Sequence, residues 1–431
     1  MTLSYRLPAW LLQLMPATLA RKWIFERGLP ALPTNEATRQ LLIDVSVIYF
    51  GDACTGIQRV VRNTYRKLLD TPPPGYRVCP IVATRNDAYR HVATNFLDEP
   101  PSNLNAGPSV QLVKVGMGDI YLGLDLAAHI VPYRTSELLC WKARGVRFFF
   151  YMYDLLPVLE PDWFNPNATK NFKRWLRVLA IMADEIICIS YTVQKEFSAW
   201  IQREYGLPAD SIKCSVIPLG VDTSALTSKA QTPAGASRAL PEWLKNKFVL
   251  MVGTIEPRKG HEEILIAFEK LWAAGETMNL VIAGKQGWKM EPFIKHLKTK
   301  TNENKHLCWL EGPPDEILLQ LYQTSSGLIM ASKGEGFGLP LIEAAYFNKP
   351  VFARDIPIFR EVAVGNVSFF SNESGTDICE SLINWIRSLS DGGPTTEIEN
   401  KKFSTWQESS GQVVSLITKS SLRLKKQTAP T

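Results

Sequence analysis

The stretch IMASKGEGFGLPLIEAAYFNKP, from Ile329 to Pro350, decides the fold class that this chain is expected to adopt. Its first residues, up to Ala331, are an apolar run that is typical of a buried strand. The next seven residues hold too many glycines for a helix interior, and Pro340 suits the first turn of the helix that we expect after them. A strand, a glycine loop and a helix start predict an α/β protein with an anion site at the loop, because backbone N–H groups and the helix dipole point there.

Two carboxylates accompany this loop. Glu335 lies among its glycines, and Glu343 is expected in the first turn of the helix. A helix N-terminus that holds a phosphate needs few carboxylates, so two of them suggest the binding of hydroxyl groups, such as those of a ribose or a sugar.

The composition is that of a globular protein with two or three domains: 431 residues, 45% hydrophobic and 21% charged. The net charge of +6 is mild, and no nucleic-acid-binding motif is present, so we expect no nucleic-acid partner. The seven cysteines are scattered without a CxxC pair. This predicts free thiols and no metal site.

The apolar stretch from Ala9 to Ala20 is too short for a membrane span, which needs ~20 residues. Trp10, Leu11, Leu14 and Met15, with the basic pair at positions 21 and 22 close behind, favour an interfacial segment within residues 1–40 that lies on a lipid surface. The alternative, a helix packed on the protein's own core, stays open.

Strand-like and helix-like segments alternate along both halves of the chain, which predicts parallel sheets. We expect the first strand at Gln40–Phe50, a loop at Gly51–Gly56 and a helix after it. A polar stretch at 223–240 reads as a linker, after which the pattern restarts. The predicted domains are therefore an N-terminal domain at 1–240, a second domain at 241–400, and at 401–431 a helix that returns to the first domain, followed by a basic tail.

Two such Rossmann-like domains would face one another across a cleft, with ligands at the carboxyl ends of the strands. Arg258 and Lys259 follow the strand predicted at 248–252, in a loop shaped by glycine and proline. Two adjacent cations suit a diphosphate, which Arg can bind through two hydrogen bonds. Such a site needs no metal and no cofactor.

Four segments together resemble a GT-B glycosyltransferase of the retaining family 4 type. They are PLGVD at 218–222, GTIEPRKG at 253–260, GEGFGLPLIE at 334–343 and WQES at 406–409. The spacing of Glu335 and Glu343 matches the E-x7-E motif of that family.

The resemblance implies a set of site residues. Glu335 would contact the donor sugar, Glu343 the ribose, and the two cations the diphosphate. The donor-binding residues would be Gly56, Gly253, Arg258, Lys259, Glu335, Gly336, Phe337, Gly338, Leu339 and Glu343. The catalytic residues would be Glu335, Asp154, Arg258 and Lys259. Many relatives have His-Asp where this chain has Tyr153-Asp154, so Tyr153 either replaces the hydrogen bond of that His or is a core aromatic.

The implied function is a retaining transfer of a mannose-like hexose, with GDP-mannose favoured as donor, to a glycan acceptor linked to polyprenyl diphosphate. We expect it to serve O-antigen or other surface polysaccharide synthesis in the cytoplasm, with peripheral contact to the inner face of the plasma membrane. Two alternatives stay open. One is a soluble transferase like glycogen or sucrose synthase, and the other is a non-catalytic subunit that binds nucleotide sugars.

Overall fold

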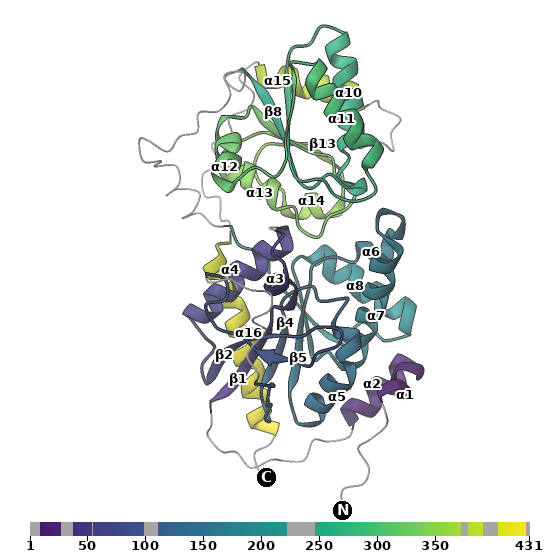
Figure 1. Ribbon diagram of the computed structural model, residues 1–431, viewed down its shortest axis with the longest axis vertical. Coiled ribbons are helices and arrows are strands. Elements are labelled where there is room, and N and C mark those ends of the chain that lie inside the picture. Colours follow the sequence, from purple (N-terminus) through teal and green to yellow (C-terminus); the bar gives the residue numbers. More distant parts are fainter. Residues whose placement is uncertain are drawn as a thin grey trace, which may run out of the picture. The chain divides into compact units, whose positions relative to one another are not determined.

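The computed structural model describes residues 9–26, 38–53, 55–98, 111–221, 246–371, 378–390 and 404–427. The chain forms two compact units, each with its own sheet (Figure 1). Unit 1 comprises residues 1–159, 166–220 and 404–431, and unit 2 comprises residues 160–165 and 221–403. Both units have the Rossmann-like architecture predicted from the sequence. The predicted linker at 223–240 lies outside the described residues.

Unit 1 is built on a seven-stranded sheet in the order β3-β2-β1-β4-β5-β6-β7. Its strands are parallel except for β3, which is antiparallel to β2 at the edge. The strands are β1 (Arg39–Asp44), β2 (Tyr76–Val82), β3 (Arg90–His91), β4 (Ile120–Gly123), β5 (Arg147–Met152), β6 (Glu185–Cys188) and β7 (Lys213–Val216).

The predicted strand at Gln40–Phe50 is wrong in its second half, where helix α3 (Ser46–Phe50) follows β1. The reason is the carboxylate of Asp44, which is completely buried. One of its oxygens accepts hydrogen bonds from the backbone N–H of Ser46, at 2.9 Å, and from the Ser46 hydroxyl. These bonds turn the chain at the end of β1 and override the β propensity of the residues that follow.

The C-terminal helix α16 (Trp406–Gln427) belongs to unit 1 and packs along α4 (Gly56–Asp70) (Figure 1). The hydroxyl of Ser409 donates to the carbonyl of Pro218 at 2.7 Å. The backbone of Trp406 lies so close to Gly220 that a Cβ there would come within 2.3 Å of the Trp406 nitrogen. The turn after β7 therefore packs against the first residue of α16.

Unit 2 is built on a six-stranded parallel sheet in the order β10-β9-β8-β11-β12-β13. The strands are β8 (Phe248–Val252), β9 (Asn279–Ala283), β10 (Leu307–Leu310), β11 (Gly327–Met330), β12 (Val351–Arg354) and β13 (Val367–Phe370). The edge strand β13 was not predicted from the sequence.

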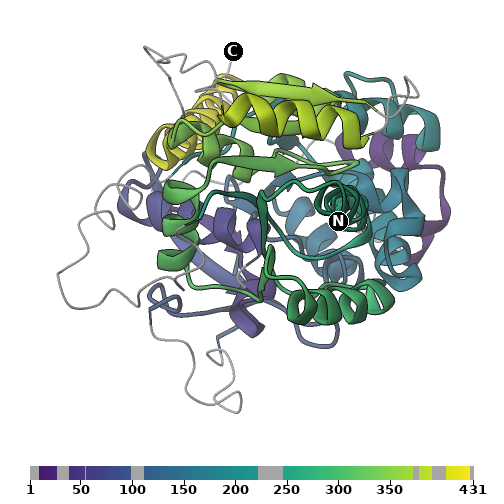
Figure 2. The same ribbon diagram turned by 90° about the horizontal axis from the view of Figure 1, so that it is seen from above.

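Helices cover both faces of this sheet, each over a buried apolar core. Helices α10 (His261–Ala273), α11 (Glu291–Glu303) and α15 (Ile378–Ser390) supply one core, and α15 runs alongside β13 (Figure 2). Helices α12 (Asp315–Thr324), α13 (Leu339–Tyr346) and α14 (Pro357–Val362) supply the other.

Helices α1 (Ala9–Leu14) and α2 (Ala17–Glu26) pack on unit 1, where α2 lies against α7 (Pro166–Met182). Leu12, Ala17 and Ala20 are buried. The guanidinium of Arg21 donates to the carbonyls of Ala183, at 2.9 Å, and Ser211, at 2.8 Å. Arg21 is thus directed inward, where it satisfies carbonyls at the end of α7, and it does not reach outward as the interfacial reading expects. Among the described residues no helix is long and apolar enough to span a membrane.

We expect Arg21→Ala to lower the free energy of unfolding by about 2 kcal/mol, because the carbonyls at the end of α7 lose hydrogen bonds to a charged donor. Thermal or urea unfolding followed by circular dichroism measures this loss. Lys22→Ala, at the exposed neighbouring position, is the matched control and should change stability by less than about 0.5 kcal/mol. Equal effects of the two substitutions would contradict the capping role of Arg21.

Candidate functional site

The two loops that the sequence marks as an anion site lie side by side in unit 2. Strands β8 and β11 are neighbours at the centre of the sheet, and the chain moves outward from β8 to β9 on one side and from β11 to β12 on the other. Their carboxyl ends therefore form the topological switch point, where open α/β sheets bind ligands. The loop at 253–260 follows β8, and the loop at 331–338 follows β11.

Backbone contacts hold these loops together. The N–H of Lys333 donates to the carbonyl of Arg258 at 2.7 Å. Gly260 has a φ of 71°, and a Cβ at this position would lie 2.5 Å from the carbonyl oxygen of Ala331. Only glycine permits both the left-handed backbone and this close approach. Gly260 therefore sets the distance between the two loops.

The cations of the first loop meet the carboxylate of the second. Glu335 accepts hydrogen bonds from Arg258 Nη1 at 2.6 Å, from the Ser332 hydroxyl at 2.7 Å, and from Lys259 Nζ. The other edge of the Arg258 guanidinium pairs with Glu256 at 2.7 Å. The side chains of Glu335, Lys259 and Arg258 are only 9%, 13% and 17% exposed. The structure thus brings together three of the four predicted catalytic residues.

Burial and the neighbouring positive charges shift the pKa of Glu335 in opposite directions. Burial alone would raise the pKa of Glu335, but the charges of Arg258 and Lys259 outweigh it and lower this pKa to about 2. Burial, followed by the neighbouring charge of Arg258, lowers the pKa of Lys259. Glu335 is therefore a carboxylate at neutral pH, and its negative charge is stabilised by the two cations.

The start of α13 agrees with the predicted glycine loop. Gly338 caps the helix with a φ of 98°, Leu339 is the first helical residue, and Pro340 is the second. Phe337 is buried at 6% exposure, so it anchors the loop in unit 2. Gly253, at the end of β8, has a φ of 142°, and a Cβ there would lie 3.6 Å from Lys259 Cε.

Glu343 does not lie in the first turn of α13, as the sequence predicts. It is the fifth residue of the helix, and no acidic residue occupies the first turn. Its side chain is buried, and one carboxylate oxygen accepts a hydrogen bond from the Tyr322 hydroxyl of α12 at 2.7 Å. Interaction with the helix dipole therefore does not explain a carboxylate at this position, because the effect is confined to the first turn.

A second ion cluster supports the same loops and was missed by sequence reasoning. Glu263, in the first turn of α10, pairs with Lys333 at 2.7 Å and with Arg354 at the end of β12. The Nε of Arg354 donates to the carbonyl of Ala331 at 3.0 Å. These residues are far apart in the sequence and carry no motif, so only the sheet order places them together.

His261 is the first residue of α10, and its side chain does not cap the helix. Gly260 is the N-cap, and no side chain caps this helix. Both ring nitrogens of His261 are buried without a hydrogen-bond partner in the described part of the chain. Burial, reinforced by the charge of Lys259, lowers the pKa of His261 to about 3, so the imidazole is neutral.

The remaining predicted residues belong to unit 1. Asp154 follows β5 and accepts a hydrogen bond from the N–H of Leu156 at 3.1 Å. Tyr153 is buried, and its hydroxyl donates to the carbonyl of Leu124 at 2.6 Å. This contact favours the reading of Tyr153 as a core aromatic. Gly56 is the first residue of α4 and not part of the preceding loop, and it is exposed.

Unit 1 also has polar residues at its own switch point, between β1 and β4. Asp44 accepts hydrogen bonds from the hydroxyls of Tyr89 and Tyr121 at 2.7 and 2.6 Å. Asp125, just after β4, accepts one from the N–H of Ile48 at 2.7 Å. Burial is the main cause that raises the pKa of Asp125 to about 7. Asp125 is not among the residues that the sequence marks as a site.

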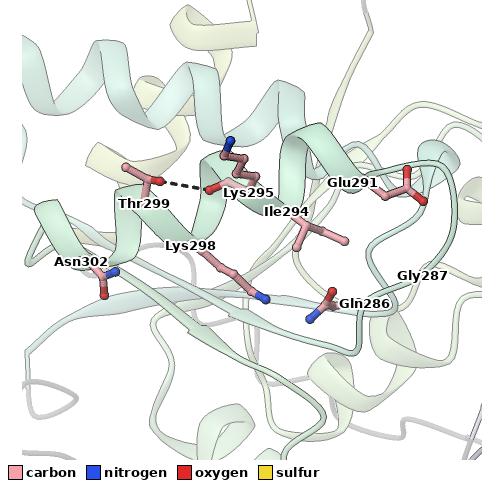
Figure 3. Close-up of a pocket in the computed structure, with 8 residues that line it drawn as sticks. All are labelled: Gln286, Gly287, Glu291, Ile294, Lys295, Lys298, Thr299 and Asn302. Atoms are coloured by element: carbon pink, nitrogen blue, oxygen red, sulfur yellow. Dashed lines mark hydrogen bonds between the residues drawn. The ribbon is translucent and has the colours of Figure 1, made fainter.

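A pocket of about 580 Å³ lies elsewhere on unit 2, between α11 and the loop after β9 (Figure 3). Its lining residues are Gln286, Gly287, Glu291, Ile294, Lys295, Lys298, Thr299 and Asn302. None of the predicted site residues lines it. Within the ranges that the structure describes, no three His, Cys, Asp or Glu residues form a group that could hold a metal ion.

Residues 236–390 match the family model of the glycosyl transferases group 1. The serotype-specific mannosyltransferase WbdA of Escherichia coli is 38% identical over 87% of this chain and 46% of its own length. The O-antigen chain mannosyltransferase RfbU of Salmonella typhimurium is 28% identical over 61% of this chain and 68% of its own. The chain thus spans about half the length of WbdA.

Among solved structures, HepE of Anabaena in complex with UDP and glucose has a TM-score of 0.54 to this chain. It is 15% identical, and the match covers 90% of this chain and all of HepE. At this identity the likeness shows a shared fold alone.

The pKa of Glu335 leads to a prediction of acid stability. A pKa that falls from 4.5 in the unfolded chain to about 2 in the folded one stabilises the fold above pH 4.5, and this contribution is lost as the pH falls through that interval. We therefore expect Glu335→Gln to lower the thermal midpoint at neutral pH, and the gap to wild type to narrow as the pH approaches 2. A gap that is independent of pH would show that the Glu335 charge does not stabilise the fold.

Proposed function

We propose that this chain, a GT-B protein of the glycosyl transferases group 1 family, transfers a sugar from a nucleoside-diphosphate donor to a glycan. The observation that carries the proposal is the pair of largely covered cations, Arg258 and Lys259, beside the glycine loop and helix start at the switch point of unit 2. Two cations that already bind a carboxylate have the donors that the anionic oxygens of a diphosphate require.

The chemistry follows from where charge grows. As the glycosidic bond breaks, negative charge develops on the β-phosphate of the leaving nucleoside diphosphate. Arg258, Lys259 and the N-terminus of α13 would stabilise that charge, which is the kind of interaction that contributes most to catalysis. The acceptor oxygen bonds to the anomeric carbon on the face from which the phosphate leaves, and the leaving phosphate takes the proton of the acceptor hydroxyl. The anomeric configuration is therefore retained without the carboxylate pair of a hydrolase.

Within this proposal each predicted residue has a role. Glu335 contacts hydroxyls of the donor sugar, and Glu343 binds the ribose. The amides of Gly338 and Leu339 bind the diphosphate, while Gly253, Gly336 and Phe337 shape the pocket. For unit 1, Asp154 remains the proposed catalytic residue and Gly56 the proposed donor-binding residue. We take mannose as the sugar because WbdA and RfbU are named mannosyltransferases, and GDP-mannose as the first donor to test. The acceptor is a growing glycan on polyprenyl diphosphate, in O-antigen synthesis.

The test of this function is turnover. The purified chain, incubated with GDP-mannose or other nucleotide sugars and a glycan on polyprenyl diphosphate, should release nucleoside diphosphate. Lys259→Ala should lower the rate about 10²–10³-fold, as expected for the loss of one group that stabilises the transition state. Donor binding without release from any donor would favour the non-catalytic subunit instead.

The substitution Glu343→Ala tests the proposed contact with the ribose. It should weaken donor binding by about 1–3 kcal/mol, the cost of polar groups left without partners. Tyr322→Phe is the matched variant, because it removes the neighbouring hydroxyl and keeps the carboxylate. An unchanged donor affinity in Glu343→Ala would make Glu343 a structural partner of Tyr322 only.

We also propose that unit 1 contacts an anionic membrane on the cytoplasmic side through α1, α2 and α7. Leu14 and Leu19 are 75% and 53% exposed although they belong to packed helices. The adjoining helix α7 carries exposed basic residues at Lys170, Lys173 and Arg174 and no acidic residue. Exposed leucines beside cations suit a surface of anionic lipid.

A double substitution, Leu14→Gln with Leu19→Gln, should weaken binding to vesicles of phosphatidylethanolamine and phosphatidylglycerol about tenfold, equivalent to ~1.4 kcal/mol. Co-sedimentation measures the binding. Ile266→Gln is the matched control, because Ile266 is 48% exposed on α10 of unit 2. If the wild type does not bind the vesicles, the proposed membrane surface is wrong and a soluble transferase is favoured. The same holds if the wild type, the double variant and Ile266→Gln bind equally.

A further inference from the structure

The two cations that the proposed function assigns to the donor already hold an anion. The carboxylate of Glu335 receives Arg258 Nη1 on one oxygen, and Lys259 Nζ and the Ser332 hydroxyl on the other. This is the bidentate arrangement that a diphosphate would need from the same side chains. The carboxylate is also less exposed than either cation, and it pairs with both of them.

The charges of the cluster cancel. Two carboxylates, Glu256 and Glu335, face two cations, Arg258 and Lys259, and these four side chains are at most 17% exposed. A diphosphate added to this neutral group would bring buried negative charge without compensation, which is costly. With Glu335 moved away, the group carries one net positive charge, and both cations have donors directed at the ligand.

We propose that Glu335 is the resident anion of the diphosphate site, and that the donor binds by exchanging its diphosphate for this carboxylate. The inference rests on the proposed function and specifies how the site fills. The Lys333–Arg258 hydrogen bond and the turn at Gly338 hold the backbone of the loop in place. The carboxylate of Glu335 therefore leaves the cations by rotation of its side chain alone. Glu256 keeps its bond to Arg258 throughout and holds the guanidinium in place.

The exchange gives the site a selectivity that two free cations would lack. A competing anion must engage Arg258 and Lys259 together to replace a carboxylate that already binds both. A diphosphate can bind both cations. A chloride ion, or a phosphate that binds one cation, replaces only part of the hydrogen bonds and ion pairs that Glu335 gives up. The released Glu335 is then free to contact the hydroxyls of the donor sugar, which is the role that the proposed function gives it.

The test is the affinity of the full chain for inorganic pyrophosphate, measured by isothermal titration calorimetry. Glu335→Gln removes the competing charge and should bind pyrophosphate at least about tenfold more tightly than wild type, equivalent to ~1.4 kcal/mol. Asp355→Asn is the matched control, because it removes one carboxylate that pairs with Arg360 at the surface of the same unit. It should change the affinity less than about twofold, as expected for a screened surface charge.

Ser332→Ala provides a second variant that leaves every charge in place. It removes one hydrogen bond to Glu335 and should tighten pyrophosphate binding about two- to fivefold, less than Glu335→Gln does. It keeps the proposal testable if Glu335→Gln fails to fold, which thermal unfolding detects. If both variants bind pyrophosphate no more tightly than the wild type does, the proposed exchange is wrong.

Lys259→Ala separates this inference from the proposed function. If GDP and pyrophosphate bind the wild type and Lys259→Ala weakens both, the diphosphate site stands whatever the result for Glu335→Gln. If neither ligand binds any variant, or Lys259→Ala binds them as the wild type does, the proposed donor site itself is wrong.

Discussion

The pairing of Glu335 with Arg258 and Lys259 is the interaction on which the site in unit 2 depends. Two like charges on adjacent residues repel one another, and burial makes their repulsion stronger. A carboxylate from the neighbouring loop compensates both of them. The cluster is stable only because β8 and β11 are adjacent in the sheet and Gly260 lets their loops approach.

The same physical constraint organises unit 1. There Asp44 and Asp125 end neighbouring strands and are buried, and hydroxyl or backbone donors satisfy each of them. At the carboxyl ends of its parallel strands, each unit thus encloses a carboxylate and surrounds it with hydrogen-bond donors. In unit 2 the donors include the cations Arg258 and Lys259, whereas in unit 1 they are neutral hydroxyl and backbone N–H groups.

The N-terminal helices combine an inward-directed charge with exposed apolar side chains. Arg21 faces inward and satisfies carbonyls at the end of α7, while Leu14 and Leu19 remain exposed. Leu12 and Ala20 of the same two helices are buried, so each helix has one packed side and at least one exposed apolar residue. A charged residue near a hydrophobic segment can therefore point inward and bind backbone carbonyls, and the sequence alone does not distinguish this from a position that faces outward.

The sequence by itself determined the α/β class, most strands, and the two loops of the candidate site, because hydrophobic periodicity and glycine and proline positions are local signals. It could not determine that Ser46–Phe50 is helical, since the carboxylate that turns the chain acts through bonds made only in the folded protein. Tertiary structure alone decided that Glu335 faces Arg258 and Lys259, that Glu343 is buried against Tyr322, and that Glu263 joins Lys333 to Arg354. Each of these contacts joins residues 20 or more positions apart, and the order of strands in the sheet, which no local pattern encodes, brings them within reach.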